Sequence, residues 1–136
     1  CLDRILAHLE GAYPEEGCGA LLGREADRAR LVVDAPPLAN AAARNRRRRY
    51  EVAPADLVRT QREARARGLE VLGFYHSHPD AEPAPSEHDR AAAWPWYVYL
   101  IVGIGAGRAR GATAWRLRDD RTTFDPVPIE IVEQKR

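Results

Sequence analysis

Two histidines at the end of a predicted buried strand form the pattern in this chain that is best suited to chemistry. Residues 71–75 are apolar, with β-branched and aromatic side chains, and Pro79 ends the segment just after His76 and His78. Such a run is typical of a buried strand. Side chains on a strand alternate between its faces, so the two imidazoles project from the same face, one pleat apart. Two histidines in this arrangement can bind one metal ion.

A carboxylate follows the histidine pair at the start of a predicted helix. Ser86 is a good N-cap for a helix that continues through Arg90 into the alanines, and Asp89 lies one turn inside it. From there Asp89 can swing back towards His76 and His78. Two His, one Asp and an open fourth position are typical of a catalytic rather than a structural zinc site. The simpler alternative is a histidine pair on a surface strand without metal, next to an ordinary helix cap.

Zinc chemistry of this kind also needs a general base. A zinc ion lowers the pKa of a bound water to roughly 7, so hydroxide becomes available at neutral pH. The segment after the histidines offers no group to take the proton, but Glu15 and Glu16 occur upstream, before Gly17-Cys18-Gly19. By charge alone, either glutamate is equally well explained as a solvated loop carboxylate.

Taken together, these residues resemble the JAMM (MPN+) metalloproteases. The family signature is a Glu beside a Cys-Gly strand start, then His-x-His-Pro, six residues, Ser, two residues and Asp. All positions of the signature are present with this spacing: Glu16 before Gly17-Cys18-Gly19, then His76, His78, Pro79, Ser86 and Asp89. The resemblance covers most of the chain, from the first predicted helix to the strand near residues 97–104.

The resemblance implies a role for each signature residue. Zinc would be held by His76, His78 and Asp89. Glu16, rather than Glu15, would act as the general acid and base, and Ser86 would donate a hydrogen bond to the scissile carbonyl. The implied reaction is hydrolysis of an amide bond.

The resemblance also implies a class of substrate. Only seven residues separate His78 from Ser86, so the insertions by which some family members recognise polyubiquitin are absent. The chain therefore resembles the minimal prokaryotic form, whose expected partner is a small ubiquitin-like β-grasp protein such as a sulfur carrier. The zinc-dependent metallo(iso)peptidase would cleave the bond after the C-terminal Gly-Gly. The alternatives are a non-catalytic MPN scaffold module and a zinc peptidase acting on short peptides.

Two other enzyme classes fit the residues less well. A zinc deaminase needs His-x-Glu followed by Pro-Cys-x-x-Cys, whereas the strand here ends in His76-Ser77-His78 and the chain has no Cys-x-x-Cys. A cysteine nucleophile at Cys18 would need a histidine partner, but the zinc site already uses the suitable ones. We therefore expect Cys18 to be a small buried residue.

Length and composition indicate one soluble domain, spanning 1–136. The 136 residues are long enough to bury a core, and the net charge of +1 gives no general reason to expect nucleic-acid or membrane binding. The basic run Arg44–Arg49 is predicted to begin a strand with exposed arginines; a phosphate-binding patch and a rim that meets an acidic protein are alternatives.

Two cysteines suggest a reducing cytoplasm. The chain begins at Cys1 and contains no Met, so we expect a few native residues to be missing. A homodimer is a weaker expectation.

The order of predicted elements gives the fold class. Helices are expected over residues 2–9, 54–67 and from Ser86 to Trp94. Strands are expected over 18–23, 31–33, 46–52, 71–78, 97–104, 112–118 and from 122 to 131, with turns at 24–30 and 105–111, a loop over 34–45 and a frayed tail at 133–136. Strands and helices alternate loosely, which predicts an α/β three-layer sandwich: a mixed, curved sheet flanked by helices. The family resemblance implies the same, a JAMM/MPN fold akin to that of cytidine deaminases.

Overall fold

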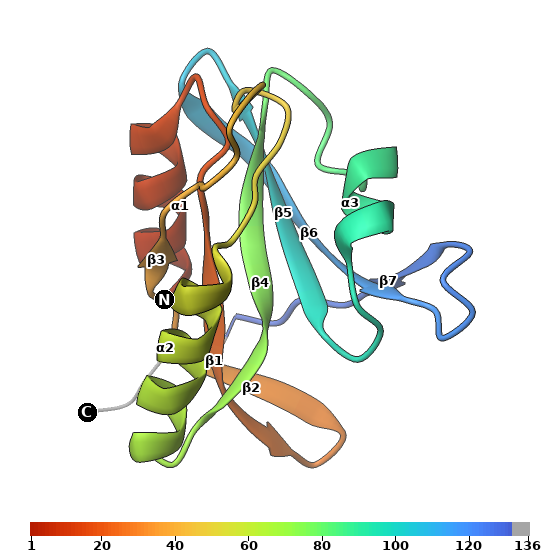
Figure 1. The fold of residues 1–136 in the computed structure, drawn as a ribbon. Helices are drawn as coiled ribbons and strands as arrows, with labels where there is room; N and C mark the ends of the chain where they lie inside the picture. Colours follow the sequence, from red (N-terminus) through yellow and green to blue (C-terminus); the bar gives the residue numbers. More distant parts are fainter. Residues whose placement is uncertain (132–136) are drawn as a thin grey trace.

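A single mixed sheet of seven strands forms the centre of the protein in this computed structural model, which describes residues 1–131 (Figure 1). The strand order is β2-β1-β4-β5-β6-β7, and β3 pairs with β1. Along the chain, the elements are α1 (Leu2–Ala12), β1 (Cys18–Ala26), β2 (Ala29–Asp34), β3 (Pro37–Leu38), α2 (Pro54–Ala66), β4 (Glu70–Pro79), α3 (Glu87–Ala92), β5 (Val98–Gly105), β6 (Arg108–Leu117) and β7 (Phe124–Val127).

The predicted buried strand is the central strand β4. It pairs antiparallel with β1 and parallel with β5, so both of its edges are hydrogen-bonded. A parallel pair needs a crossover connection, and the segment that carries α3 supplies it. Every residue from Val71 to His78 is buried. The end of β4 is therefore a rigid place from which to project functional side chains.

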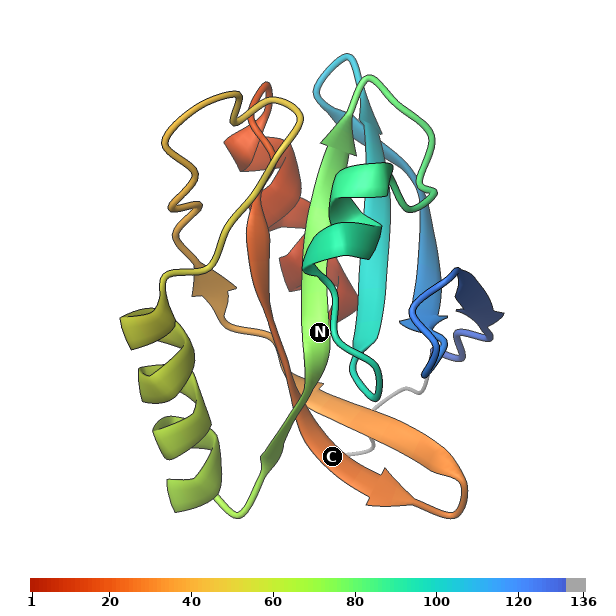
Figure 2. The same ribbon diagram turned by 45° about the vertical axis from the view of Figure 1, so that its right-hand side comes forward.

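Helices cover both faces of the sheet, as the alternation of elements predicted. One face packs α1 through Ile5 and Leu9 against a cluster that contains Tyr75 and Leu100. The opposite face packs α2 and the end of α3 against Phe74 and its neighbours. Figure 2 shows α3 in front of the sheet and α1 behind it. The predicted three-layer α/β sandwich is confirmed.

The predicted turns at 24–30 and 105–111 are wrong in length, because each is a tight hairpin. β1 runs on to Ala26 and β2 begins at Ala29, so only Asp27 and Arg28 form the turn, with φ of 46° and 68°. Ala106 and Gly107 form the second turn, with φ of 52° and 80°. Positive φ at both central residues is the geometry of two-residue hairpins. Polar residues that suggested loops instead occupy the exposed ends of paired strands.

The strand predicted over residues 46–52 does not form. Residues 46–48 make a turn and residues 49–53 are irregular. The backbone of this segment bonds elsewhere: the Arg46 carbonyl accepts from Glu16 N–H at 2.7 Å, and the Glu51 carbonyl accepts from Ala41 N–H at 2.8 Å. These separate bonds to two different segments take the place of a continuous strand ladder. The segment instead folds over the start of β1 as a long loop.

Three smaller expectations also differ from the structure. The predicted loop 34–45 contains the two-residue strand β3, and the last strand ends at Val127 rather than Ile131. Trp115, expected in the core, is half-buried on β6. The predicted frayed tail, 133–136, lies outside the described residues. No helix within residues 1–131 is both long and apolar enough to cross a bilayer.

Candidate metal centre and active site

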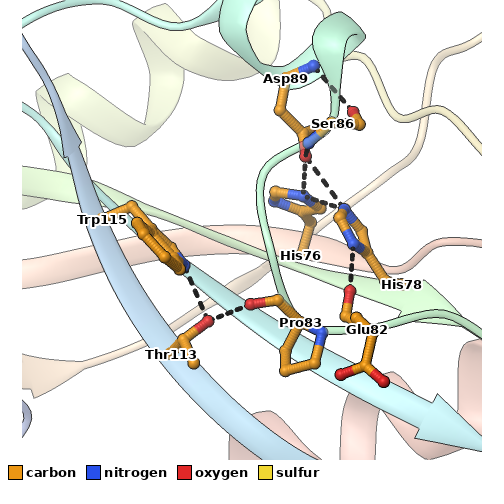
Figure 3. A network of polar contacts seen from close by, with 8 residues as sticks. All are labelled: His76, His78, Glu82, Pro83, Ser86, Asp89, Thr113 and Trp115. Carbon is orange, nitrogen blue, oxygen red and sulfur yellow. Dashed lines mark hydrogen bonds and ion pairs between the residues drawn. The ribbon is translucent and has the colours of Figure 1, made fainter. Parts of the chain in front are cut away.

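Three ligand atoms converge at the end of β4. His76 Nε2 lies 3.1 Å from His78 Nε2, and Asp89 Oδ2 lies 3.2 Å from the first and 3.0 Å from the second (Figure 3). Tetrahedral zinc with bond lengths of about 2.0–2.1 Å separates its ligand atoms by roughly 3.3 Å. The three atoms are therefore arranged as a zinc ion requires, and the predicted ligands come together on the α3 face of the sheet.

The local sequence explains why Asp89 points at the histidines. Ser86 is the N-cap of α3, and its Oγ accepts from Asp89 N–H at 3.0 Å. In return, Asp89 Oδ2 accepts from Ser86 N–H at 2.9 Å. This reciprocal pair is a capping box, with Asp in the position of the usual Glu or Gln. The capping box holds the Asp89 carboxylate in one orientation, with Oδ2 also facing the imidazoles.

The loop before α3 is attached to the sheet at two points. The Glu82 carbonyl lies 2.9 Å from His78 Nδ1, which places the imidazole proton on Nδ1 and leaves Nε2 free for a metal. Thr113 on β6 donates to the Pro83 carbonyl and accepts from Trp115 Nε1 at 2.8 Å (Figure 3). Sequence reasoning missed Glu82 and Thr113, because both contacts connect segments that are distant in the chain or use the backbone.

The pKa values of the three side chains depend on their burial and on the hydrogen bonds between the carboxylate and the imidazoles. Burial lowers the pKa of His76, which is 0% exposed. Burial also opposes charge on His78, but its hydrogen bonds to Asp89 and to the Glu82 carbonyl outweigh burial and raise its pKa. Burial would raise the pKa of Asp89, yet hydrogen bonds to His76 and His78 hold this pKa well below its usual range. The anionic carboxylate thus favours a cation among the three atoms, which a metal ion can supply.

Glu16 lies beside this cluster, although it is far away in the sequence. One of its carboxylate oxygens and one nitrogen from each histidine all lie within 4.8 Å of one another. The residue is 4% exposed, and burial raises its pKa to about 8. Within the described part of the chain, Oε1 is buried without a hydrogen-bond partner. A buried, unpartnered carboxyl group with a pKa near neutrality is suited to exchange protons with a ligand in the site.

Two side chains, Asn40 and Ser77, bond to the backbone at Glu16 and Gly17, and sequence reasoning missed both. Asn40 Nδ2 donates to the Glu16 carbonyl at 3.0 Å and to the Arg49 carbonyl at 2.9 Å, while its Oδ1 accepts from Ala42 N–H and Glu51 N–H. On the other side, Ser77 Oγ accepts from Gly17 N–H at 2.9 Å. Ser77 lies between the two histidines but projects to the opposite face of β4. The long loop and β4 together hold Glu16 at the cluster.

Two cavities open beside the cluster. The first has a volume of about 560 Å³ and is lined by Tyr13, Pro14, Glu16, Arg47, Arg48, His78, Pro79, Asp80, Ala81 and Ser86. The second, of about 640 Å³, is mostly aromatic and is lined by Tyr50, Glu51, Val52, Leu57, Phe74, His88, Ala92, Trp94, Tyr97 and Tyr99. Tyr50 separates the second cavity from the cluster, because its ring stacks on His76 with centroids 4.4 Å apart.

The environment of Cys18 does not favour the cysteine-nucleophile alternative. Cys18 is fully buried at the start of β1, and burial raises the pKa of its thiol to about 12. The thiolate that a cysteine nucleophile requires is therefore almost absent at neutral pH.

The matching family agrees with this geometry. Residues 1–118 match a family model described as prokaryotic homologs of the JAB domain. The chain belongs to this family. The resemblance to JAMM/MPN proteins is confirmed, and the JAB domain accounts for every element from α1 to β6.

Similarity to individual proteins is consistent with this family assignment. Over 88 residues it is 46% identical to desampylase of Haloferax volcanii, an alignment that spans 62% of this chain and 61% of that protein's length. A solution structure of a protein from Salinibacter ruber is 40% identical, with a TM-score of 0.74, over 94% of this chain and 85% of the other. A structure described as JAMM, a metalloprotease-like zinc site in the proteasome and signalosome, is 18% identical, with a TM-score of 0.56, over 97% of this chain and 91% of the other. This last likeness is one of fold.

Proposed function

We propose that this JAB domain is a zinc-dependent metallo(iso)peptidase, which hydrolyses the amide bond after the C-terminal Gly-Gly of a small ubiquitin-like protein. The observation that carries the proposal is the convergence of His76 Nε2, His78 Nε2 and Asp89 Oδ2 within 3.0–3.2 Å of one another, with buried Glu16 beside them. The similarity to desampylase supports a ubiquitin-like substrate. We also expect the protein to act in the cytoplasm.

The donor set is suited to zinc, and zinc supplies one part of the chemistry. The residues that would hold it are His76, His78 and Asp89, three protein ligands with the fourth position open, as in catalytic zinc sites. When bound, zinc polarises a carbonyl and lowers the pKa of water to roughly 7. The remaining steps are assigned to side chains of the chain itself.

Glu16 performs the proton transfers in this proposal. Its carboxylate removes a proton from the attacking water, and the resulting carboxylic acid then protonates the departing amine. In the metal-free protein burial raises the pKa of Glu16 to about 8, and a cation at the neighbouring ligands would lower it, which favours the carboxylate that accepts the proton of water. Burial causes the upward shift, so the buried position of Glu16 is part of the proposed mechanism.

Ser86 is assigned to charge stabilisation. Its hydroxyl lines the same cavity as Glu16 and can donate a hydrogen bond to the carbonyl oxygen as negative charge develops. The same Oγ accepts from Asp89 N–H, so donation and capping use different parts of the hydroxyl group. This donor favours the transition state over the ground state, because the carbonyl oxygen gains negative charge as the transition state is approached.

A cleavage experiment tests the proposal. Zinc-loaded protein is incubated with a β-grasp carrier extended beyond its Gly-Gly by a peptide, and with the same carrier joined to a lysine side chain. Mass spectrometry follows release, with Glu16→Gln as the inactive control. We expect release by the wild type only, with about one zinc per chain in both proteins. Absence of both release and zinc would favour the scaffold alternative, and cleavage of free Gly-Gly peptides without a carrier would favour the short-peptide peptidase.

A further inference from the structure

The basic run Arg44–Arg49 has no part in the proposed mechanism, yet two of its members reach the active-site cavity. Arg47 and Arg48 line the 560 Å³ cavity together with Glu16 and Ser86. Both side chains are exposed. The neighbouring members Arg44 and Arg49 are equally exposed but do not line the cavity. The run is therefore divided into a pair at the mouth of the active site and others outside it.

In the described part of the chain, neither of the two cavity arginines has a carboxylate partner. Among residues 1–131, five other arginines form ion pairs within the chain, whereas neither Arg47 nor Arg48 does. Asp80, which also lines the cavity, is already hydrogen-bonded: its Oδ2 accepts from Tyr13 Oη–H at 2.8 Å and its Oδ1 from Ala106 N–H at 3.3 Å. Two positive charges at the mouth of the cavity are thus available to a ligand.

The backbone holds this pair in a set position relative to the general base. Glu16 N–H donates to the Arg46 carbonyl at 2.7 Å, so the residue before the pair is bonded directly to the base. Asn40 bridges Glu16 and Arg49 on the other side of the pair. The backbone from which both arginine side chains extend is therefore held next to the general base.

We propose that Arg47 and Arg48 form a carboxylate-binding subsite, which engages an acidic group of the polypeptide substrate next to the scissile amide. The inference rests on the proposed function and adds a determinant of substrate choice to it. Guanidinium groups match carboxylates in charge and in planar geometry, and hydrogen bonds between them are stronger than neutral ones. The carboxylate has two possible sources: an Asp or Glu side chain near the diglycine, or the free α-carboxylate of a one-residue leaving group.

Four fluorescent peptides distinguish these sources in a binding assay that needs no turnover. All contain Gly-Gly joined to one further residue; they carry either Glu or Gln before the diglycine, and end in either a carboxylate or an amide. Anisotropy is measured with zinc-loaded Glu16→Gln protein. We expect at least one carboxylate peptide to bind about 5- to 10-fold more tightly than its neutral counterpart. The position of that carboxylate identifies the source.

Matched double variants assign the preference to the pair. In the Glu16→Gln background, Arg47→Gln/Arg48→Gln should reduce the preference to within about twofold, whereas Arg44→Gln/Arg49→Gln, with the same change in net charge, should retain it. Equal binding of all four peptides, no binding of any, or the same loss in both double variants would overturn the inference.

A single-stranded oligonucleotide that binds more tightly than every peptide, and loses affinity with Arg47→Gln/Arg48→Gln, would overturn it in favour of nucleic acid. Failure of the proposed function would instead appear as absence of carrier cleavage by the protein with Glu16 intact.

Discussion

Glu16 has an ionisable side chain in a buried position, and burial determines whether its carboxyl group is protonated at neutral pH. An isolated glutamate in water is ionised at neutral pH, but burial raises the pKa of Glu16 to about 8. The neighbouring Glu15 directly precedes it in the chain and is exposed. These two glutamates therefore form a natural pair for experiment, one inside the active-site cavity and one in solvent.

The first prediction concerns catalysis by Glu16. Glu16→Gln keeps the shape of the side chain but removes its ability to exchange a proton, so we expect kcat to fall by about 10²- to 10⁴-fold. Zinc content, measured by atomic absorption, should be unchanged because Glu16 is not a proposed ligand. Glu15→Gln should retain activity within about twofold. A fully active Glu16→Gln protein would contradict the assigned role.

The second prediction concerns the pH dependence of stability in metal-free protein. The folded-state pKa of Glu16, about 8, lies above the ordinary value of 4.5, so the folded state favours the neutral acid. The contribution of Glu16 to stability is fully present below about pH 4.5 and is lost as pH rises to about 8. Denaturant unfolding in the presence of a chelator should therefore show that Glu16→Gln becomes increasingly more stable than the wild type across this range. A constant difference between the two proteins would rule out the shift.

At the scale of elements, the position of His76 and His78 depends on the close approach of β4 to β5. Gly73 on β4 faces β5, and a Cβ at this position would lie 1.8 Å from the Val98 carbonyl oxygen. Gly111 on β6 is a useful contrast, because a Cβ there would have no atom within 4 Å. The parallel pairing that leads into His76 and His78 therefore requires glycine at Gly73.

The third prediction follows from this contrast. Gly73→Ala should lower the free energy of unfolding by about 3 kcal/mol or more, because backbone atoms must move to admit the methyl group. Gly111→Ala should change it by less than about 1 kcal/mol. Urea unfolding of both variants checks the prediction. Equal effects would mean that β4 and β5 lie further apart than in this structure.

The fourth prediction tests the long loop that holds Glu16. Asn40→Asp keeps the acceptor for Ala42 N–H and Glu51 N–H but loses the donors to the Glu16 and Arg49 carbonyls. We expect kcat to fall by about 10-fold, since a small displacement of a catalytic group is costly, while bound zinc is retained. Hydrogen exchange over residues 40–51 should become faster. Unchanged kcat would show that Glu16 is positioned without Asn40.

At the scale of the whole molecule, the metal site joins distant parts of the chain. Its proposed ligands come from β4 and α3, and the general base from the segment before β1. A metal that binds only the folded protein stabilises it by about 4 kcal/mol at a concentration 1,000 times its Kd. Zinc bound as proposed would connect the sheet to its covering helix, and so would contribute to folding as well as to chemistry.

The fifth prediction is a difference in Tm between metal-bound and metal-free protein. Removing zinc with a chelator should lower Tm by roughly 10–15 °C for a domain of this size. Calorimetry with and without added zinc measures the change, and Asp89→Asn should reduce it. Identical Tm values under the two conditions would mean that the folded protein does not bind zinc tightly.

The sequence by itself determined the local parts of the site. The two-residue spacing places His76 and His78 on one face of a strand, and the three-residue spacing between Ser86 and Asp89 forms a capping box at a helix start. Both follow from periodicity within one element, which depends only on neighbouring residues. The third layer of the sandwich could likewise be predicted, because each amphipathic helix must cover a face of the sheet.

Only the tertiary structure decided how distant segments meet. The family signature pointed to Glu16, but its position depends on Asn40 and Ser77, which lie 24 and 61 residues away along the chain. The predicted strand over 46–52 failed for the same reason: its backbone groups bond to Glu16 and Ala41 rather than to a neighbouring strand. Tyr50 and the pair Arg47 and Arg48 reach the active site only because this loop folds over β1. Local periodicity cannot predict such contacts, since they depend on which surfaces the folded sheet brings together.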